Sequence, residues 1–172
     1  MTKPNSFIQL ATTLLRPRMG FRHVFSYAEL LDKSVISERC PEPEFVTLAH
    51  YEGRRFIVNS DGIATIVPRK DFKVFGVVWC VHEIGLAALD IHAGVPHDHD
   101  RYGCFARSAS GQLCVTEFYA TRNRTEGLAD PSYLSPIIAA ARHWRLPDAY
   151  IEEMASWARP ASTNGKNTRG AR

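Results

Sequence analysis

The sequence predicts a mixed α+β fold in which antiparallel strands come first and helices close the chain. Runs rich in β-branched and aromatic residues stand close together at Arg55–Asn59, Ile63–Val67 and Lys73–His82. Asp61-Gly62 separates the first two runs, which is typical of a tight hairpin turn. Further on, Leu134–Trp144 carries apolar residues at helical spacing. These observations indicate a meander of strands with helices packed against it.

Length and composition are those of an ordinary globular protein with one domain. The chain has 172 residues, of which 45% are hydrophobic and 23% charged. The formal net charge is +3, but much of the basic excess lies near the two ends, at Arg16, Arg18, Lys166, Arg169 and Arg172. A nucleic-acid-binding domain gathers its basic residues on one folded face, and no such stripe is visible. We therefore expect no nucleic acid and no membrane among the partners, since no apolar run approaches the ~18 residues of a membrane span.

The four cysteines indicate a reducing compartment. Cys80, Cys104 and Cys114 lie inside strand-like runs, and Cys40 stands alone before a proline. Without a Cys-x-x-Cys pair, a zinc site or a thioredoxin-like motif is not indicated. We expect buried thiols in a cytoplasmic protein.

The first half of the chain divides into a leader, strands and a short helix. Residues 1–20 form a leader whose apolar residues could make a short helix on the core or on a partner: Phe7, Leu10, Leu14 and Leu15. Phe21–Tyr27 and Glu44–Tyr51 are the first strands, and Asp32–Cys40, which stops at Pro41, is helical. After Lys73–His82 the spacing of the apolar residues changes. The segment Gly85–Asp90 therefore predicts a short helix, which is closed by Gly94 and Pro96.

The second half continues with two strands and two helices. Arg101–Ser108 and Gln112–Ala120 are the strands, joined around Gly111. Leu134–Trp144 is the first helix, and the second starts at Leu146-Pro147 because proline is favoured at a first helical position. The folded domain therefore spans residues 21–159, and residues 160–172, which are mostly small and polar and carry Lys166, Arg169 and Arg172, form a basic, flexible tail.

Several of these motifs together resemble the gamma-glutamylcyclotransferase family, which has an AIG2-like fold. The similarity rests on ATIVP at Ala64–Pro68, VFGVVW at Val74–Trp79 and LD at Leu89-Asp90. The order of these motifs matches a family strand ending in ATI-P, a V-GVVW strand and an LD-x-x-EG turn. The resemblance covers roughly Phe21 to Trp157, and it implies a small, mostly antiparallel β-barrel with C-terminal helices packed on it.

Two functional motifs of the family are altered here. The catalytic glutamate of the LD-x-x-EG turn is replaced by Ala93, directly before Gly94. The family's Y-G-S-N-L loop, whose backbone N–H groups hold the glutamyl part of the substrate, reads Tyr27-Ala28-Glu29-Leu30-Leu31. Without its glycine this loop cannot easily adopt a positive φ. We therefore expect ordinary 5-oxoproline-forming activity to be weak or absent.

Glu29 and His92 are the candidate catalytic residues. Glu29 lies on the loop that faces the cavity in the family, so its carboxylate could replace the one missing at Ala93. The alternative is a solvated glutamate at a helix start. His92 precedes the vacated position and could act as a base near neutral pH, although adjacent residues usually point apart. Asp90 matches an aspartate that often accompanies the family's LD motif. Alternatively, its side chain makes only a turn or cap hydrogen bond.

The remaining site residues are expected to hold a ligand. Tyr27, Ala28, Leu30, Ala93 and Gly94 would border one cavity together with two tyrosines that match family positions, Tyr102 and Tyr133. The cluster of His92, His97, Asp98, His99 and Asp100 offers a further possibility: His97 and His99 would share one face of a strand and could bind a metal with His92 or Asp90 as the third ligand. The predicted site nevertheless includes no metal ligand and no cofactor.

The functional hypothesis follows from these residues. The protein would act on a small glutamyl- or amide-bearing metabolite with altered acid/base chemistry, as a transferase- or lyase-like enzyme. The alternative is a non-catalytic small-molecule-binding protein on the same barrel. The sequence does not set the oligomeric state.

Overall fold

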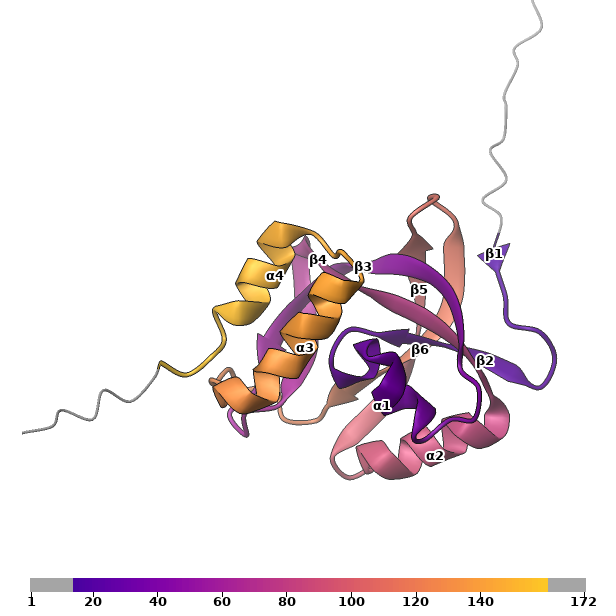
Figure 1. The fold of residues 1–172 in the computed structure, drawn as a ribbon, viewed down its shortest axis with the longest axis horizontal. Coiled ribbons are helices and arrows are strands. Elements are labelled where there is room, and N and C mark those ends of the chain that lie inside the picture. Colours follow the sequence, from indigo (N-terminus) through magenta and orange to yellow (C-terminus); the bar gives the residue numbers. More distant parts are fainter. Residues whose placement is uncertain (1–13, 161–172) are drawn as a thin grey trace, which may run out of the picture.

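Six strands and four α-helices make up the computed structural model, which describes residues 14–160 (Figure 1). The strands are β1 Leu14–Leu15, β2 Phe21–Ser26, β3 Glu44–Val58, β4 Ala64–His82, β5 His99–Ser108 and β6 Leu113–Thr121. The helices are α1 Lys33–Ser37, α2 Glu83–Ala93, α3 Pro131–His143 and α4 Asp148–Ala155, with a 3-10 turn η1 at Glu29–Leu31. The predicted α+β class, with helices at the end of the chain, is confirmed.

The sheet closes into a barrel of five strands. The strand order is β1-β6-β2-β4-β3-β5, and β5 pairs back with β6, so that only β1 lies outside the ring. All neighbours in the ring are antiparallel except β2 and β6, which run parallel where Val24 faces Glu117. The barrel that the family resemblance implies is therefore present, with one parallel seam.

Two long strands replace four of the predicted runs. The segments Glu44–Tyr51 and Arg55–Asn59 join as β3, and Ile63–Val67 and Lys73–His82 join as β4. The register jumps from Glu52 opposite Lys73 to Arg54 opposite Pro68, while Gly53 takes a φ of 71°. A bulge of this kind bends a strand without ending it. Gly53 and Pro68, which interrupt the strand pattern in the sequence, therefore lie inside β3 and β4.

The short helix suggested for the leader is not present at Leu14 and Leu15, the two of its apolar residues that the structure describes. Leu14 and Leu15 are not helical; they form β1, which pairs in parallel with Leu113 and Cys114 of β6. The rest of the predicted leader helix, and residues 161–172 of the predicted tail, lie outside the described residues.

The predicted short helix is longer than expected but ends where predicted. α2 begins after His82, whose ring nitrogen accepts the N–H of Ile84, and it continues to Ala93. Gly94 ends it in the left-handed region, at φ 66° and ψ 37°. A glycine reaches this conformation without a Cβ penalty, so the Gly94 signal is confirmed.

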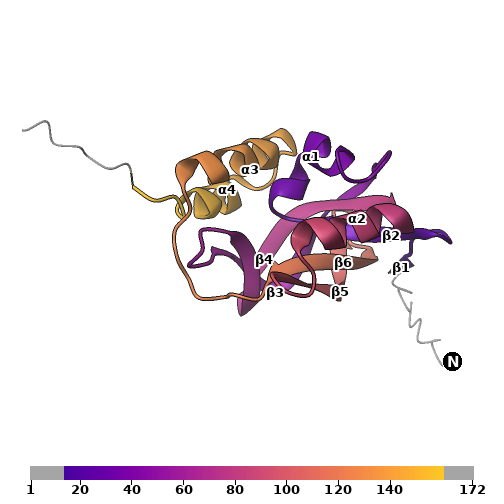
Figure 2. The same cartoon turned by 90° about the horizontal axis from the view of Figure 1, so that it is seen from below.

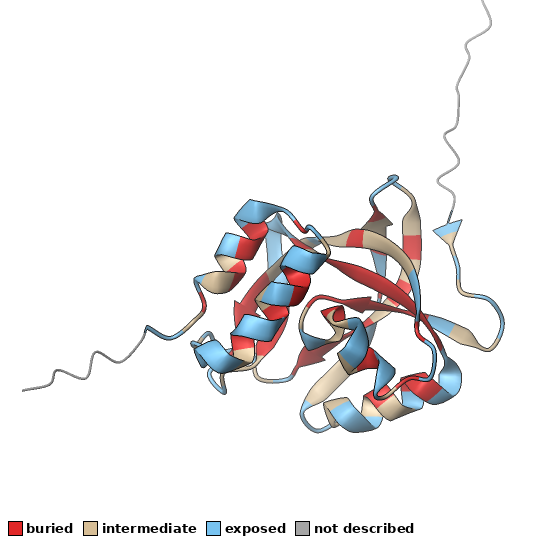
Figure 3. Cartoon of the chain, in the orientation of Figure 1, coloured by how far each residue is buried: buried red, intermediate tan, exposed pale blue. Residues whose placement is uncertain are grey.

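The core lies between the barrel wall and the helices. Val77, Trp79 and Leu89 are buried, and Phe75 is partly buried against this core. Figures 1 and 2 show α3 and α4 side by side against the barrel, and each turns a buried face toward it (Figure 3). The longest described helix, α3, has 13 residues, and none of the helices within residues 14–160 is suited to crossing a membrane.

Candidate functional site

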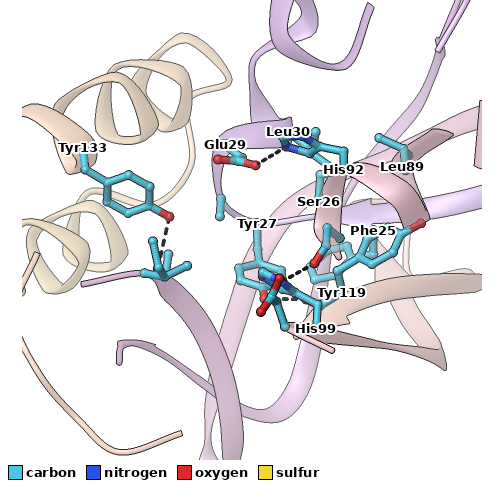
Figure 4. Close-up of a pocket in the computed structure, with 15 residues that line it drawn as sticks. Phe25, Ser26, Tyr27, Glu29, Leu30, Leu89, His92, His99, Tyr119 and Tyr133 are labelled. Atoms are coloured by element: carbon cyan, nitrogen blue, oxygen red, sulfur yellow. Dashed lines mark hydrogen bonds and ion pairs between the residues drawn. The ribbon is translucent and has the colours of Figure 1, made fainter. Parts of the chain in front are cut away.

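A cavity of about 360 Å³ opens between the 27–31 loop, the end of α2 and the start of α3 (Figure 4). Seven elements (β2, η1, β4, α2, β5, β6 and α3) and the loops beside them contribute to its lining: Phe25, Ser26, Tyr27, Ala28, Glu29, Leu30, Ile63, Ala64, Leu89, His92, Ala93, Asp98, His99, Tyr119 and Tyr133. The volume is within the range of small-molecule sites. The cavity thus gathers most of the predicted site residues, which lie far apart in the sequence.

Two tryptophan side chains hold the loop at residues 27–31 in place by hydrogen bonds to its backbone carbonyls. Trp79 donates its Nε1–H to the carbonyl of Leu30 at 2.9 Å, and Trp144 donates to the carbonyl of Leu31 at 2.7 Å. Ala28 has a negative φ, −129°, as expected for a loop that has lost its glycine. The loop therefore keeps a defined shape at the cavity wall and carries Glu29 into place.

Replacing Trp144 by phenylalanine should lower the free energy of unfolding, because the carbonyl of the buried Leu31 loses its donor. A lost partner of this kind costs about 1–3 kcal/mol. The matched control is Trp157→Phe, since the buried Nε1 of Trp157 has no partner among residues 14–160. Urea unfolding should give a clearly larger loss for Trp144→Phe. Equal losses would mean that the bond to Leu31 adds nothing to the packing change.

Glu29 and His92 meet across the cavity rim. His92 Nε2 lies 2.9 Å from Glu29 Oε1, although 63 residues separate them in the chain (Figure 4). Glu29 comes from η1 and His92 from the last turn of α2, and both side chains are partly exposed. An imidazole N–H can donate to the carboxylate, so the two predicted catalytic residues form one hydrogen-bonded pair.

Ala93 puts a methyl group into the cavity, and two polar side chains stand beside it. Asp98 packs so closely on Gly94 that a Cβ at Gly94 would lie 2.4 Å from Asp98 Oδ2. His99 Nδ1 lies 2.7 Å from the Ala93 carbonyl oxygen. A carbonyl only accepts, so Nδ1 carries the proton, and the Nε2 of a neutral His99 ring can accept a hydrogen bond. The region of the missing glutamate is therefore polar despite the alanine.

Three tyrosine hydroxyls form the inner wall. Tyr27 donates to the carbonyl of Tyr119 at 2.5 Å, and Tyr119 donates to Asp90 Oδ1 at 2.8 Å. Tyr133 accepts the N–H of Ala64 at 3.1 Å. Burial raises the pKa of all three hydroxyls above the ordinary value of 10.0, and the bond to Asp90 raises the pKa of Tyr119 further. They stay protonated near neutral pH.

Asp90 has a structural role, but its side chain binds Tyr119 and Arg101 and does not make the turn or cap hydrogen bond that was its alternative. Besides Tyr119 it binds Arg101, whose Nε lies 3.0 Å from Oδ1. Arg101 also pairs with Glu117 on the neighbouring strand. Asp90 thus ties α2 to β5 and β6 and is not among the residues that line the cavity.

The structure does not bring Tyr102 to this cavity, so its expected placement is wrong. In β5 and β6, Tyr102 pairs with Phe118 and its neighbour Arg101 pairs with Tyr119, and neighbouring residues in a strand face opposite sides. Tyr119 therefore reaches the cavity and Tyr102 does not. Gly94 is not a lining residue either, although it adjoins Ala93.

Asp98, His99 and Tyr119 also line the cavity, although they were not among the predicted site residues. The only signal for the first two was the cluster of histidines and aspartates after Gly94, which suggested metal binding. Within residues 14–160 no three His, Cys, Asp or Glu side chains converge as a ligand set. His92 instead binds Glu29, and His99 binds a backbone carbonyl.

The closed mixed barrel with an added strand and C-terminal helices is the gamma-glutamylcyclotransferase-like fold. Residues 73–154 match the model of the AIG2-like family. The resemblance inferred from the sequence motifs is confirmed.

Solved structures of the same fold cover most of the chain. An uncharacterised human protein is 25% identical over 86% of this chain and 93% of its own, with a TM-score of 0.74. A gamma-glutamyl cyclotransferase is 25% identical over 85% of this chain and 92% of its own, with a TM-score of 0.75. YkqA of Bacillus subtilis is 17% identical over 81% of this chain and 56% of its own, with a TM-score of 0.67. A search of curated proteins finds no significant match.

Proposed function

We propose that this cyclotransferase-like protein is an enzyme that acts on a small glutamyl- or amide-bearing metabolite through the Glu29–His92 pair. The observation that carries the proposal is the 2.9 Å contact between these side chains at the rim of the cavity that contains Ala93. The carboxylate that the family places at position 93 would be supplied instead from the opposite wall.

The chemistry requires one group that first accepts a proton and then returns it. In the family reaction the substrate's α-amino nitrogen attacks its own γ-carbonyl carbon, and the amide C–N bond breaks. A carboxylate can take the proton of the attacking amine and give it to the leaving nitrogen. Glu29 has this capacity, and the N–H of His92 holds one of its oxygens in a fixed direction. The pair would thus perform this kind of proton transfer on a ligand that is held differently from the family's substrate, because the 27–31 loop that binds the glutamyl group in the family is changed here.

Other cavity groups would position the ligand. Tyr133 already accepts a backbone N–H, so its own O–H remains to donate to a ligand oxygen. The Nε2 of a neutral His99 ring would accept a ligand N–H, because its Nδ1 is engaged by the Ala93 carbonyl. The apolar lining residues, among them Phe25, Ile63 and Leu89, would cover the carbon skeleton of a small metabolite.

Support for an acyl-transferring chemistry comes from the comparisons. The solved structure of a gamma-glutamyl cyclotransferase shares the fold at 25% identity over most of both chains. The four cysteines are buried, unpaired thiols, as a cytoplasmic location would require.

The test measures 5-oxoproline release from a panel of gamma-glutamyl amines. We expect little or no product from the native protein. Ala93→Glu alone should recover little, because the 27–31 loop is also changed. Adding Ala28→Gly, Glu29→Ser and Leu30→Asn should recover more, since the family's loop returns together with its glutamate. Efficient turnover by the native protein would contradict the altered chemistry.

A non-catalytic binding protein is the second candidate, and the methyl group at Ala93 favours it. A thermal-shift screen of small amides and glutamyl compounds separates the two candidates, since a cavity ligand stabilises the fold by mass action. A ligand that stabilises the protein and is recovered unchanged would support binding alone. A ligand that is consumed supports the enzyme.

A further inference from the structure

A second, smaller cavity is lined in part by Tyr102 and lies at the inward face of β5 and β6. Its volume is about 140 Å³. It is lined by Tyr51, Arg54, Ile66, Pro68, Tyr102, Gly103, Phe118, Ala120 and Arg124. Along the same strands Cys104 and Ala106 are buried on this face, while Phe105 is exposed on the other. We call this site the arginine hollow.

An aromatic floor runs through the arginine hollow. Phe118 packs edge-on against Tyr51 at 5.4 Å between ring centroids and stacks on Tyr102 at 5.5 Å. Each tyrosine in turn carries one guanidinium: Arg54 lies over Tyr51 at 5.2 Å, and Arg124 lies over Tyr102 at 5.7 Å. The floor therefore has a positive group at each end.

Hydrogen bonds hold the two arginines to this floor. Arg124 Nη2 donates to the hydroxyl of Tyr102 at 2.9 Å, and Arg54 Nη2 is 3.4 Å from the hydroxyl of Tyr51. The Tyr102 hydroxyl donates to Asp100 Oδ2 at 3.1 Å. Asp100 is thus bound to Tyr102, and its Oδ2 also lies 3.7 Å from Nε of Arg122.

The charge of the hollow is unbalanced. No aspartate or glutamate lines it, and within residues 14–160 neither Arg54 nor Arg124 lies within ion-pair distance of a carboxylate. Neighbouring arginines differ, because Arg55 pairs with Glu153, and Arg101 with Asp90 and Glu117. Arg54 is also partly buried, and a desolvated cation is stabilised when an anion approaches it.

We propose that the arginine hollow binds a small aromatic oxyanion, whose phosphate or carboxylate group lies between Arg54 and Arg124 and whose ring packs on Phe118. Guanidinium groups bind both oxyanions through paired N–H donors. The volume suits a single ring with one charged group, and an aromatic floor favours a planar partner. This site does not depend on the chemistry proposed for the larger cavity.

Calorimetric titration of the full-length protein tests the site with phenyl phosphate, benzoate and uncharged phenol. One of the two anions should bind saturably at one site, and phenol should not bind. Tighter binding of phenyl phosphate identifies a phosphate ligand, and tighter binding of benzoate a carboxylate. Arg54→Gln and Arg124→Gln should each weaken the anion at least about tenfold, since a charge-assisted hydrogen bond is lost.

The matched control is Arg122→Gln, which removes the same charge from the same loop but lies outside the hollow. Its affinity for the anion should stay within about twofold of the native protein. Phe118→Leu provides a second readout: it should weaken phenyl phosphate and leave inorganic phosphate unchanged. Absence of saturable binding, or an equal loss in Arg122→Gln, overturns the proposal.

Discussion

Changing Glu29 to glutamine should lower turnover of the native substrate by about 10²–10⁴-fold, the usual contribution of a positioned acid/base group. Glutamine keeps the size and shape of the side chain but has no ionisable proton site. It can still accept the hydrogen bond from His92, so the loop and the cavity should keep their form. Ligand affinity, measured as a thermal shift or a dissociation constant, should therefore change far less than the rate.

Two further variants complete this experiment. His92→Gln removes the group that orients the carboxylate, so we expect a smaller loss of rate than in Glu29→Gln. Glu38→Gln alters an exposed glutamate that is not part of the cavity lining and should leave the rate unchanged. An unaltered rate in Glu29→Gln would exclude the relocated carboxylate. Catalysis would then have to come from another cavity residue, such as His92, Asp98 or His99, or the protein would only bind its ligand.

Gly76→Ala should destabilise the protein by at least about 3 kcal/mol, at the upper end for overpacked sites. A Cβ at position 76 would lie 2.1 Å from the carbonyl oxygen of Ser26 and 3.1 Å from the ring of Phe25. The first of these atoms belongs to the backbone, so β2 and β4 would have to separate. Ser26 leads directly into the 27–31 loop, and the cavity should be distorted in any molecules that still fold.

Gly103→Ala is the matched control for this change. Gly103 is also a strand glycine, but a Cβ there would meet no atom within 4 Å. Chemical denaturation should show a near-neutral effect for Gly103→Ala beside a large loss for Gly76→Ala. If both variants have the native midpoint, the close approach of Ser26 is not a real constraint.

The fold could be predicted from the sequence because its signals are local. The hairpin at Asp61-Gly62, the helix stop at Gly94 and the apolar spacing of α3 each follow from a few neighbouring residues. The continuity of β3 and β4 could not be predicted in this way. Gly53 and Pro68 look like chain breaks, and only the pairing of the two strands across the bulge makes them interior positions.

The candidate site was less predictable because it depends on which side of a strand a residue faces. The family resemblance brought the 27–31 loop, His92 and Ala93 together correctly. It selected Tyr102, whereas Tyr119 lines the cavity in the structure. Tyr102 pairs with Phe118, the residue next to Tyr119, and neighbouring residues of a strand face opposite sides of the sheet. Nor could the sequence place His99, whose role depends on a bond to the Ala93 carbonyl.

The parallel seam between β2 and β6 also affects how the protein is made. Tyr27 and Tyr119, which bond across this part of the barrel, are 92 residues apart. At roughly 5–20 residues per second on the ribosome, the first strand waits about 5–18 s for its partner. Until β6 emerges, β2 and β5 both present unpaired edges, to which other chains can add. The barrel is therefore completed late in synthesis, and the nascent chain exposes these two edges until then.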